Sequence, residues 1–178
     1  MGSEIIQDEE AMKRIEELVV SDRSSTMLVC VQGTEEGELC GEIYSCYLKD
    51  PIWFRGVGDL VLKLDEMCNW VGMPHATTDP RFLNLETERR YREASSHHPQ
   101  ADRSNLTYTM DQIPFKQALK AREVLIIYVK YRQFSSLQGS IRGKITKGKV
   151  VNFRSALELM RMISMIQLYT RSGELSAQ

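Results

Sequence analysis

Residues 150–166 read VVNFRSALELMRMISMI, and residues 51–67 read PIWFRGVGDLVLKLDEM. Each stretch places Phe-Arg just before an apolar pattern of helical spacing. In both, an acidic residue stands four positions after the arginine and a leucine five positions after it. The same order of signals at two distant places predicts an internal repeat.

The similarity continues on the N-terminal side of both stretches. At a shift of 98 residues, MLVCV at 27–31 aligns with LIIYV at 125–129. At the same shift the pattern Leu-x-Gly-x-Ile recurs at 39–43 and 137–141, and a shift of 99 then aligns the two Phe-Arg pairs. A one-residue insertion in the intervening turn accounts for the change. We infer a tandem duplication.

Each unit is predicted to hold three strands followed by one helix. β-branched and aromatic residues with period-two alternation favour strands at 26–32, 38–47 and 52–54, and at 123–132, 137–145 and 150–153. An apolar stripe follows each set, with Gly72 and Pro74 ending the first helix and Ser155 capping the second.

The predicted fold class is α+β: a tandem duplication of a βββα unit, with an antiparallel sheet and two packed helices. The sheet is expected to be open or a partly closed barrel, and two separate small sheets remain the alternative. Joint packing is favoured because a unit of about 50 residues is marginal for a core of its own.

The predicted boundaries follow the repeat. They are an N-terminal helix and lead-in at 1–25, the first unit at 26–72, a polar insert at 73–122, the second unit at 123–171 and a tail at 172–178. We expect residues 26–171 to form one domain. Within the insert, NLETERRYREA at 84–94 is predicted to form a short helix.

Composition and charge limit the class of protein. The 178 residues are 42% hydrophobic and 26% charged, which is typical of a globular protein. Apolar runs of the ~20 residues that a membrane span needs are missing, and the acidic start does not resemble a signal peptide. A cytoplasmic protein without a membrane partner is expected.

The charge is distributed unevenly along the chain. Residues 1–72 carry a net charge of −9 and residues 122–178 a net charge of +7, so the halves attract each other or the basic half meets an anionic partner.

The cysteines do not predict a metal site. Cys30, Cys40, Cys46 and Cys68 form no CxxC pair, and a zinc site would need tighter spacing to the three histidines than this sequence has. A disulfide between Cys30 and Cys40 across a hairpin is possible, but reduced thiols are favoured in a cytoplasmic protein.

Two segments resemble a known family. RQFSSLQGSI at 132–141 followed by FRSALEL at 153–159 resembles the C-terminal signature, with WQG and FRSALEL, of a family of small uncharacterised proteins common in Gram-positive gut bacteria. Phe134 and Leu137 depart from that signature, the latter standing in place of its tryptophan. GDLVLKLDEMCNWVGMPHATT at 58–78 resembles a second segment of the same family. The resemblance supports the fold and implies no activity, cofactor or catalytic residue.

The Phe-Arg pairs are interpreted as structural hinges of the repeat. Phe54 and Phe153 are expected in the core, with Arg55 and Arg154 bridging each helix to the sheet. The alternative is a pair of symmetry-related anion sites, because both arginines stand at helix starts.

The second hairpin is predicted to carry a basic face. Strand alternation places Tyr128, Lys130, Arg132, Arg142 and Lys144 on one face and an apolar set that includes Tyr131 on the other. Cations interleaved with an aromatic ring are typical of a nucleic-acid surface, so these five are candidate anion- or nucleic-acid-binding residues. The equivalent face of the first unit carries acidic residues, which favours ion pairs within the protein or across a dimer.

The sequence favours a non-enzymatic binding or assembly module that acts through protein–protein contacts, with a protein partner or a second copy. No P-loop, GxGxxG, HExxH or nucleophile–base motif appears, so neither catalytic residues nor cofactors are predicted. A nucleic-acid- or anion-binding protein that uses the basic hairpin is the alternative.

Overall fold

A computed structural model describes residues 25–45, 48, 50–96 and 120–172. The predicted N-terminal helix, Cys46 and two of the three histidines, His97 and His98, lie outside these residues.

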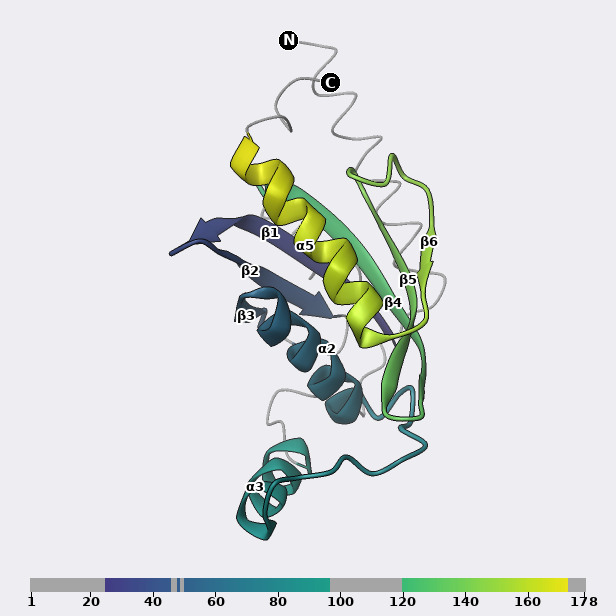
Figure 1. Ribbon diagram of the computed structural model, residues 1–178. Coiled ribbons are helices and arrows are strands. Elements are labelled where there is room, and N and C mark those ends of the chain that lie inside the picture. Colours follow the sequence, from purple (N-terminus) through teal and green to yellow (C-terminus); the bar gives the residue numbers. More distant parts are fainter. Residues whose placement is uncertain (1–24, 46–47, 49, 97–119, 173–178) are drawn as a thin grey trace.

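Six strands form one antiparallel sheet in the order β3-β2-β1-β4-β5-β6 (Figure 1). The strands are β1 (Thr26–Glu35), β2 (Glu38–Ser45), β3 (Ile52–Arg55), β4 (Glu123–Gln133), β5 (Ser136–Gly143) and β6 (Val151–Phe153). β1 and β4 pair at the centre, from Thr26 opposite Tyr128 to Val31 opposite Glu123. The two predicted units therefore share a single open sheet, with the short strands β3 and β6 at its edges.

The helices are arranged asymmetrically around this sheet. α2 (Val57–Val71) and α5 (Ala156–Ser172) lie across the same face, while α3 (Leu85–Ser96) extends beyond the end of α2 as a separate arm (Figure 1). α3 corresponds to the short helix predicted at 84–94. None of the helices in the described residues is both long and apolar enough to cross a membrane.

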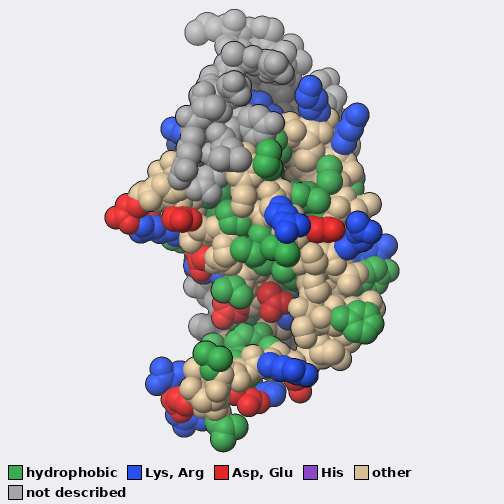
Figure 2. Space-filling view, viewed as in Figure 1, with side chains coloured by type: hydrophobic (Ala, Val, Ile, Leu, Met, Phe, Trp, Pro, Cys, Tyr) green, Lys and Arg blue, Asp and Glu red, His purple; other side chains and the backbone are tan. Residues whose placement is uncertain are grey.

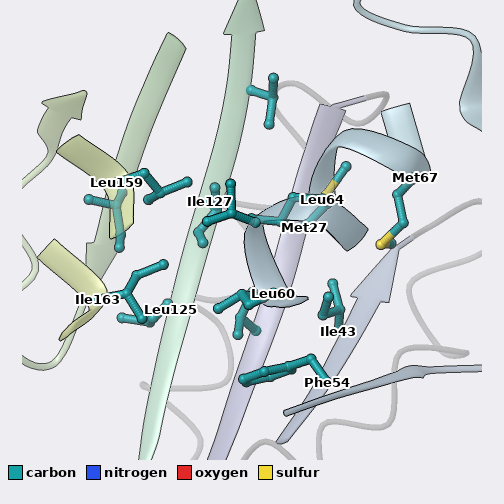
Figure 3. Close-up of a cluster of buried hydrophobic side chains, with 14 of the residues drawn as sticks. Met27, Ile43, Phe54, Leu60, Leu64, Met67, Leu125, Ile127, Leu159 and Ile163 are labelled. Carbon is teal, nitrogen blue, oxygen red and sulfur yellow. The ribbon is translucent and has the colours of Figure 1, made fainter. Parts of the chain in front are cut away.

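One hydrophobic core lies between the sheet and the two helices. Figure 3 shows side chains from β1 to β4, α2 and α5 converging there, and all of those labelled are buried: Met27, Ile43, Phe54, Leu60, Leu64, Met67, Leu125, Ile127, Leu159 and Ile163. Because both units contribute to it, neither half of this core is complete alone. Burial at roughly 25 cal/mol per Å² of apolar surface is the main source of stability for such a core.

Each helix starts with the same backbone contact. The backbone N–H of Arg55 donates to the Asp59 carboxylate over 2.9 Å, and that of Arg154 donates to Glu158 over 2.7 Å. Each acid thus reaches back to the amide of the residue before the N-cap, one position earlier than in a capping box. Ser155 caps α5 as predicted, because its Oγ accepts the Glu158 amide over 3.1 Å.

The predicted hinges are only partly as expected. Phe54 and Phe153 are fully buried core residues. The Arg55 guanidinium pairs with Glu36 in the β1–β2 turn, so it does bridge its helix start to the sheet. Arg154 is exposed, and its described ion pair is a contact of 3.6 Å to Glu158 in its own helix, so the predicted bridge to the sheet is wrong for this residue.

Each central strand contains one irregularity in its pairing. The register shifts between Val31 and Gly33 in β1 and between Val129 and Tyr131 in β4. In β4 the pairing passes over Lys130, as in a β-bulge, where an extra residue reverses the faces of the residues beyond it.

Because of this bulge, the predicted basic face is wrong for the residues beyond Lys130. Arg132 pairs with Leu137, a core residue, and is itself buried on the side of the helices. It does not share the face of Arg142. Tyr131, predicted on the apolar face, is exposed instead. A strictly alternating pattern cannot show this, because the one-residue bulge lies between Arg132 and the regular part of the strand.

The face of the sheet opposite the helices carries a second apolar cluster. Leu28, Cys30 and Tyr44 are buried there, with Ala121, Val124 and Ile126 packed against them. Burial raises the pKa of Cys30 to about 12. Cys30, Cys40 and Cys68 are free thiols, so the disulfide alternative between Cys30 and Cys40 is not formed.

Glycine is required at one equivalent position in each unit, next to the buried phenylalanines. A Cβ at Gly41 would lie 2.1 Å from the Cys30 carbonyl oxygen. At Gly139 it would lie 1.9 Å from the Tyr128 carbonyl oxygen and 3.0 Å from the Phe153 ring. The backbone of the neighbouring strand would have to move to admit any side chain.

We predict that Gly139→Ala lowers the free energy of unfolding by about 1–3 kcal/mol through overpacking. Gly58→Ala is the matched control, since a Cβ at this helical position meets nothing within 4 Å. The control should be about 0.5–1 kcal/mol more stable than the parent. Urea unfolding of both variants measures the difference, and equal stabilities would contradict the close approach of the strand.

Candidate functional site

A groove of about 610 Å³ opens where α2, α3, the β4–β5 turn and the start of α5 meet. It is lined by Val61, Leu62, Asp65, Cys68, Asn69, Gly72, Pro74, His75, Ala76, Thr78, Asp79, Pro80, Tyr91, Arg92, Arg132, Ser135, Ser136, Leu137 and Ala156. Figure 2 shows hydrophobic side chains at the surface around the hollow between the α3 arm and the rest of the molecule.

Arg132 holds the groove together from inside. Its Nε donates to Asp65 Oδ1 over 2.8 Å, one terminal nitrogen donates to Asn69 Oδ1 over 2.6 Å, and the other contacts the Pro74 carbonyl oxygen at 3.3 Å. The arginine is only 6% exposed, whereas the Asp65 side chain is 37% exposed. A residue of the second unit is thereby fixed to the helix of the first. Its charge and its hydrogen-bonding nitrogens are occupied by the protein's own groups.

The loop after α2 is joined to the end of β4. Ala76 forms a parallel bridge with Arg132, and the Thr77 amide donates to the Arg132 carbonyl oxygen over 3.0 Å. The hydroxyls of Thr77 and Thr78 then accept the backbone amides of Phe134 and Ser135, over 3.3 and 2.9 Å. The threonine side chains therefore fix the β4–β5 turn at the rim of the groove.

α3 closes the far side through its tyrosine. Asn69 Nδ2 donates to the Tyr91 hydroxyl over 2.7 Å, and the ring of Tyr91 packs on Phe82 with centroids 5.0 Å apart. The same asparagine therefore contacts both Arg132 and α3. The outer surface of this helix carries ion pairs such as Arg90–Glu86, which are exposed and contribute little to stability.

Large apolar side chains are exposed at, or next in sequence to, residues that line the groove. Leu62 on α2 is 71% exposed, Phe134 in the β4–β5 turn is 83% exposed and Leu157 at the start of α5 is 55% exposed. Leu62 lines the groove, and the other two are each adjacent in sequence to lining residues, Ser135 and Ala156. Exposed apolar side chains grouped at a concave surface mark a contact site more than isolated ones do.

The five predicted anion-binding residues do not form one surface. Arg132 is buried in the groove, while Tyr128 and Arg142 are half-buried on the opposite face of the sheet. Desolvation lowers the pKa of Arg142. Lys130 is exposed with its ammonium 5.2 Å from the ring centroid of Tyr131, and Lys144 is exposed in the turn after β5. Their binding role stays a prediction.

Sequence reasoning missed the groove, although many of its residues lie in segments for which strands and helices were predicted. Asp65 and Pro74 lie in the 58–78 stretch, and Arg132 lies 67 residues after Asp65. Periodicity could not have paired them, because it says nothing about which polar side chains meet across elements.

The two units differ at this place. At the shift of 98, Thr34 stands where the second unit has Arg132, and at the shift of 99, Ser164 stands where the first has Asp65. The equivalent position at the other end of the sheet therefore lacks both members of the ion pair. Within the described residues, this ion pair is therefore formed at one end of the sheet.

Glu123 is a second buried polar group, near the β5–β6 turn. Its Oε1 accepts the Ile145 amide over 3.2 Å, and within the described residues its Oε2 has no hydrogen-bond partner. Desolvation raises the pKa of this carboxyl group, partly offset by hydrogen bonds from the Ile145 and Lys144 amides. The folded state thus favours the protonated acid.

The groove offers little nucleophilic chemistry. Burial raises the pKa of Cys68 to about 12, so the thiol that lines the groove is protonated at neutral pH. Among the described residues, no group of three or more His, Cys, Asp or Glu side chains is placed to hold a metal ion.

We predict an asymmetric response to breaking the Arg132–Asp65 pair. Asp65→Ala leaves a buried guanidinium without its counter-charge and should cost about 3 kcal/mol or more. Arg132→Met should cost less, because the remaining carboxylate is already partly in water. Urea unfolding of both variants tests the order, and a larger loss for Arg132→Met would contradict it.

A pH-dependent stability difference is expected at Glu123. The pKa of the Glu123 carboxyl group is higher in the folded state than its unfolded value of about 4.3. The carboxyl group therefore supports the folded state fully below pH 4.3, and this contribution to the free energy of unfolding is lost as the pH rises through the folded-state pKa. Glu123→Gln should therefore become progressively more stable than the parent as the pH rises. Thermal unfolding from pH 4 to 8 measures this, and a constant difference would show that the carboxyl group is not desolvated.

Comparison with protein-family models, with curated proteins and with solved structures found no match to this chain.

Proposed function

We propose that this chain is a non-enzymatic binding or assembly module that acts through protein–protein contacts, and that the groove is its docking surface. The observation that carries the proposal is that exposed Leu62 lines the groove, while exposed Phe134 and Leu157 are each next in sequence to a lining residue. The fully buried core of a protein interface is more apolar than its rim, and a few well-packed side chains carry most of the binding energy.

The interior of the groove supports contact rather than chemistry. Arg132 is already neutralised by Asp65, so it offers no free cation to an anionic ligand. Cys68 is protonated and mostly enclosed. The polar network instead fixes the shape of the walls, which lowers the cost of ordering them when a partner binds.

The duplication is part of the same proposal. Three features support it: the strand order β1-β2-β3-α2 repeats as β4-β5-β6-α5, the central strands carry bulges 98 residues apart, and equivalent glycines face the buried phenylalanines. On this view one copy acquired Arg132 and the other Asp65, and the groove arose between them. The family resemblance and a cytoplasmic location, which three free thiols favour, complete the proposal.

Nucleic-acid or anion binding is the second candidate. The exposed cations Lys130 and Lys144, followed by Lys147 and Lys149 in the same region of the chain, favour it. It is the weaker candidate because Arg132 is buried elsewhere and Arg142 is half-buried, which leaves fewer cations to neutralise phosphates.

Site-specific photo-crosslinking in cells that express the full chain tests the docking surface. A benzoylphenylalanine in place of Leu62 should give a discrete adduct of higher mass, because a partner that covers the groove lies against this position. The same group in place of Val150, an exposed side chain beside β6, is the matched control. No adduct beyond that of the control would contradict the groove as a docking surface.

A further inference from the structure

The face of the sheet opposite α2 and α5 is buried, although none of the described helices lies on it. Both of those helices cross the other face, and α3 extends beyond the end of α2 (Figure 1). Yet Leu28, Cys30 and Tyr44, which form the apolar cluster of this face, are only 3%, 1% and 5% exposed. A sheet face that meets solvent carries accessible and mostly polar side chains. The burial therefore calls for a cover from outside the described residues.

The burial follows β1 from its first residue. On this face of the strand Thr26, Leu28 and Cys30 are at most 5% exposed, whereas Gln32 beyond them is exposed. The residues of β4 on the same face are only half-buried. Residues 1–24 lead into β1 at the end where this burial begins. The cover thus lies along the strand that the N-terminal segment enters.

The N-terminal segment has the pattern that such a cover needs. Apolar residues at helical spacing predict a helix over residues 8–20. It would be about 20 Å long, similar to the roughly 17 Å that residues 26–30 span as a strand. An isolated helix of this length is only marginally stable in water, so it needs a surface on which its apolar stripe can pack. That stripe consists of Ala11, Met12, Ile15, Leu18 and Val19.

The internal stretch outside the described residues matches this face less well. Residues 97–119 include Pro99 and Pro114, and a proline inside a helix removes a hydrogen bond and kinks or breaks it. The run LTYTM at 106–110 alternates apolar and polar residues with period two, which is not a helical stripe. The sequence therefore favours the N-terminal segment as the cover.

The charge of this segment also suits the face. Arg142 lies on this face of β5 and is half-buried, and desolvation lowers its pKa. No carboxylate among the described residues forms an ion pair with it. Glu42, the acid on the same face, accepts the Tyr44 hydroxyl over 2.6 Å. Residues 1–24 carry seven acidic and three basic side chains, whereas acids and bases are equal in number at 97–119. An acidic segment would bring counter-charges close to a guanidinium that has lost part of its water.

We propose that residues 8–20 form an amphipathic helix that docks on this face of the sheet, with its apolar stripe over Leu28, Cys30 and Tyr44. The occupant is the chain's own N-terminal segment. This surface and the groove lie on opposite sides of the sheet, so the inference does not depend on the docking function proposed above. Two of the predicted anion-binding residues lie on the same face, and a docked helix withholds them from an anionic ligand.

Photo-crosslinking within the purified full chain tests the occupant. A benzoylphenylalanine in place of Ile15, at the centre of the stripe, should give an adduct with the mass of one chain. Peptide mapping should place that adduct in β1, β2 or β4. The same group in place of Glu17, on the opposite side of the predicted helix, is the matched control and should not react with these strands. An adduct at position 15 with a second chain or with the helical face, or the lack of any adduct, overturns the inference.

Thiol labelling gives a second measurement. In the parent, Cys30 should react with N-ethylmaleimide as slowly as Cys68, because burial raises the pKa of both thiols to about 12. Ile15→Asp places a charge in the stripe and should raise the Cys30 rate at least about tenfold, with the Cys68 rate unchanged. Glu17→Asp puts the same residue on the other side of the helix and should change neither rate. An unchanged Cys30 rate in Ile15→Asp, or an equal rise at Cys68, contradicts a cover on this face.

Discussion

The pairing of β1 with β4 is the contact on which the rest of the structure depends. It brings the two units into one sheet, so that α2 and α5 lie on the same face and share one core. A unit of about 50 residues would bury too little apolar surface to offset its conformational entropy. The six residue pairs between β1 and β4 bring the apolar sides of both units together in one core. They also bring the end of β4 close to α2.

The groove follows from this arrangement together with one buried charge. The pairing places the end of β4 beside α2, where Arg132 meets Asp65 and Asn69. Removing an arginine from water is costly, and a buried pair is weak support for stability as such. The Arg132–Asp65 pair has a clear effect on the geometry. The Arg132 guanidinium connects α2, the loop after α2 and β4, while Asn69 also contacts α3. The walls of the groove are thus held by a single connected set of polar contacts.

Much of the fold could be predicted from the sequence, because it is written in local patterns. The period-two strands, the helix starts at Phe-Arg and the Ser155 cap all lie in contiguous segments, and the structure places them where these patterns indicate.

The two tight turns were expected as longer loops, since Phe134-Ser135 lacks the Asn-Gly signature of such a turn. The face of Arg132 was predicted wrongly because the bulge at Lys130 leaves no mark in the alternation. The groove was not predictable in this way, since Asp65 and Arg132 are 67 residues apart and their contact depends on the packing of α2 against the sheet.

The two edge strands limit how the molecule can associate. β3 has four residues and β6 three, and a helix begins two or three residues after each strand ends. So short an edge gives an approaching strand few free amides and carbonyls, and short edges protect natural sheets from pairing edge to edge. Growth by sheet extension, which has no natural stopping point, is therefore disfavoured. A partner bound at the proposed docking groove would instead leave both edge strands uncovered.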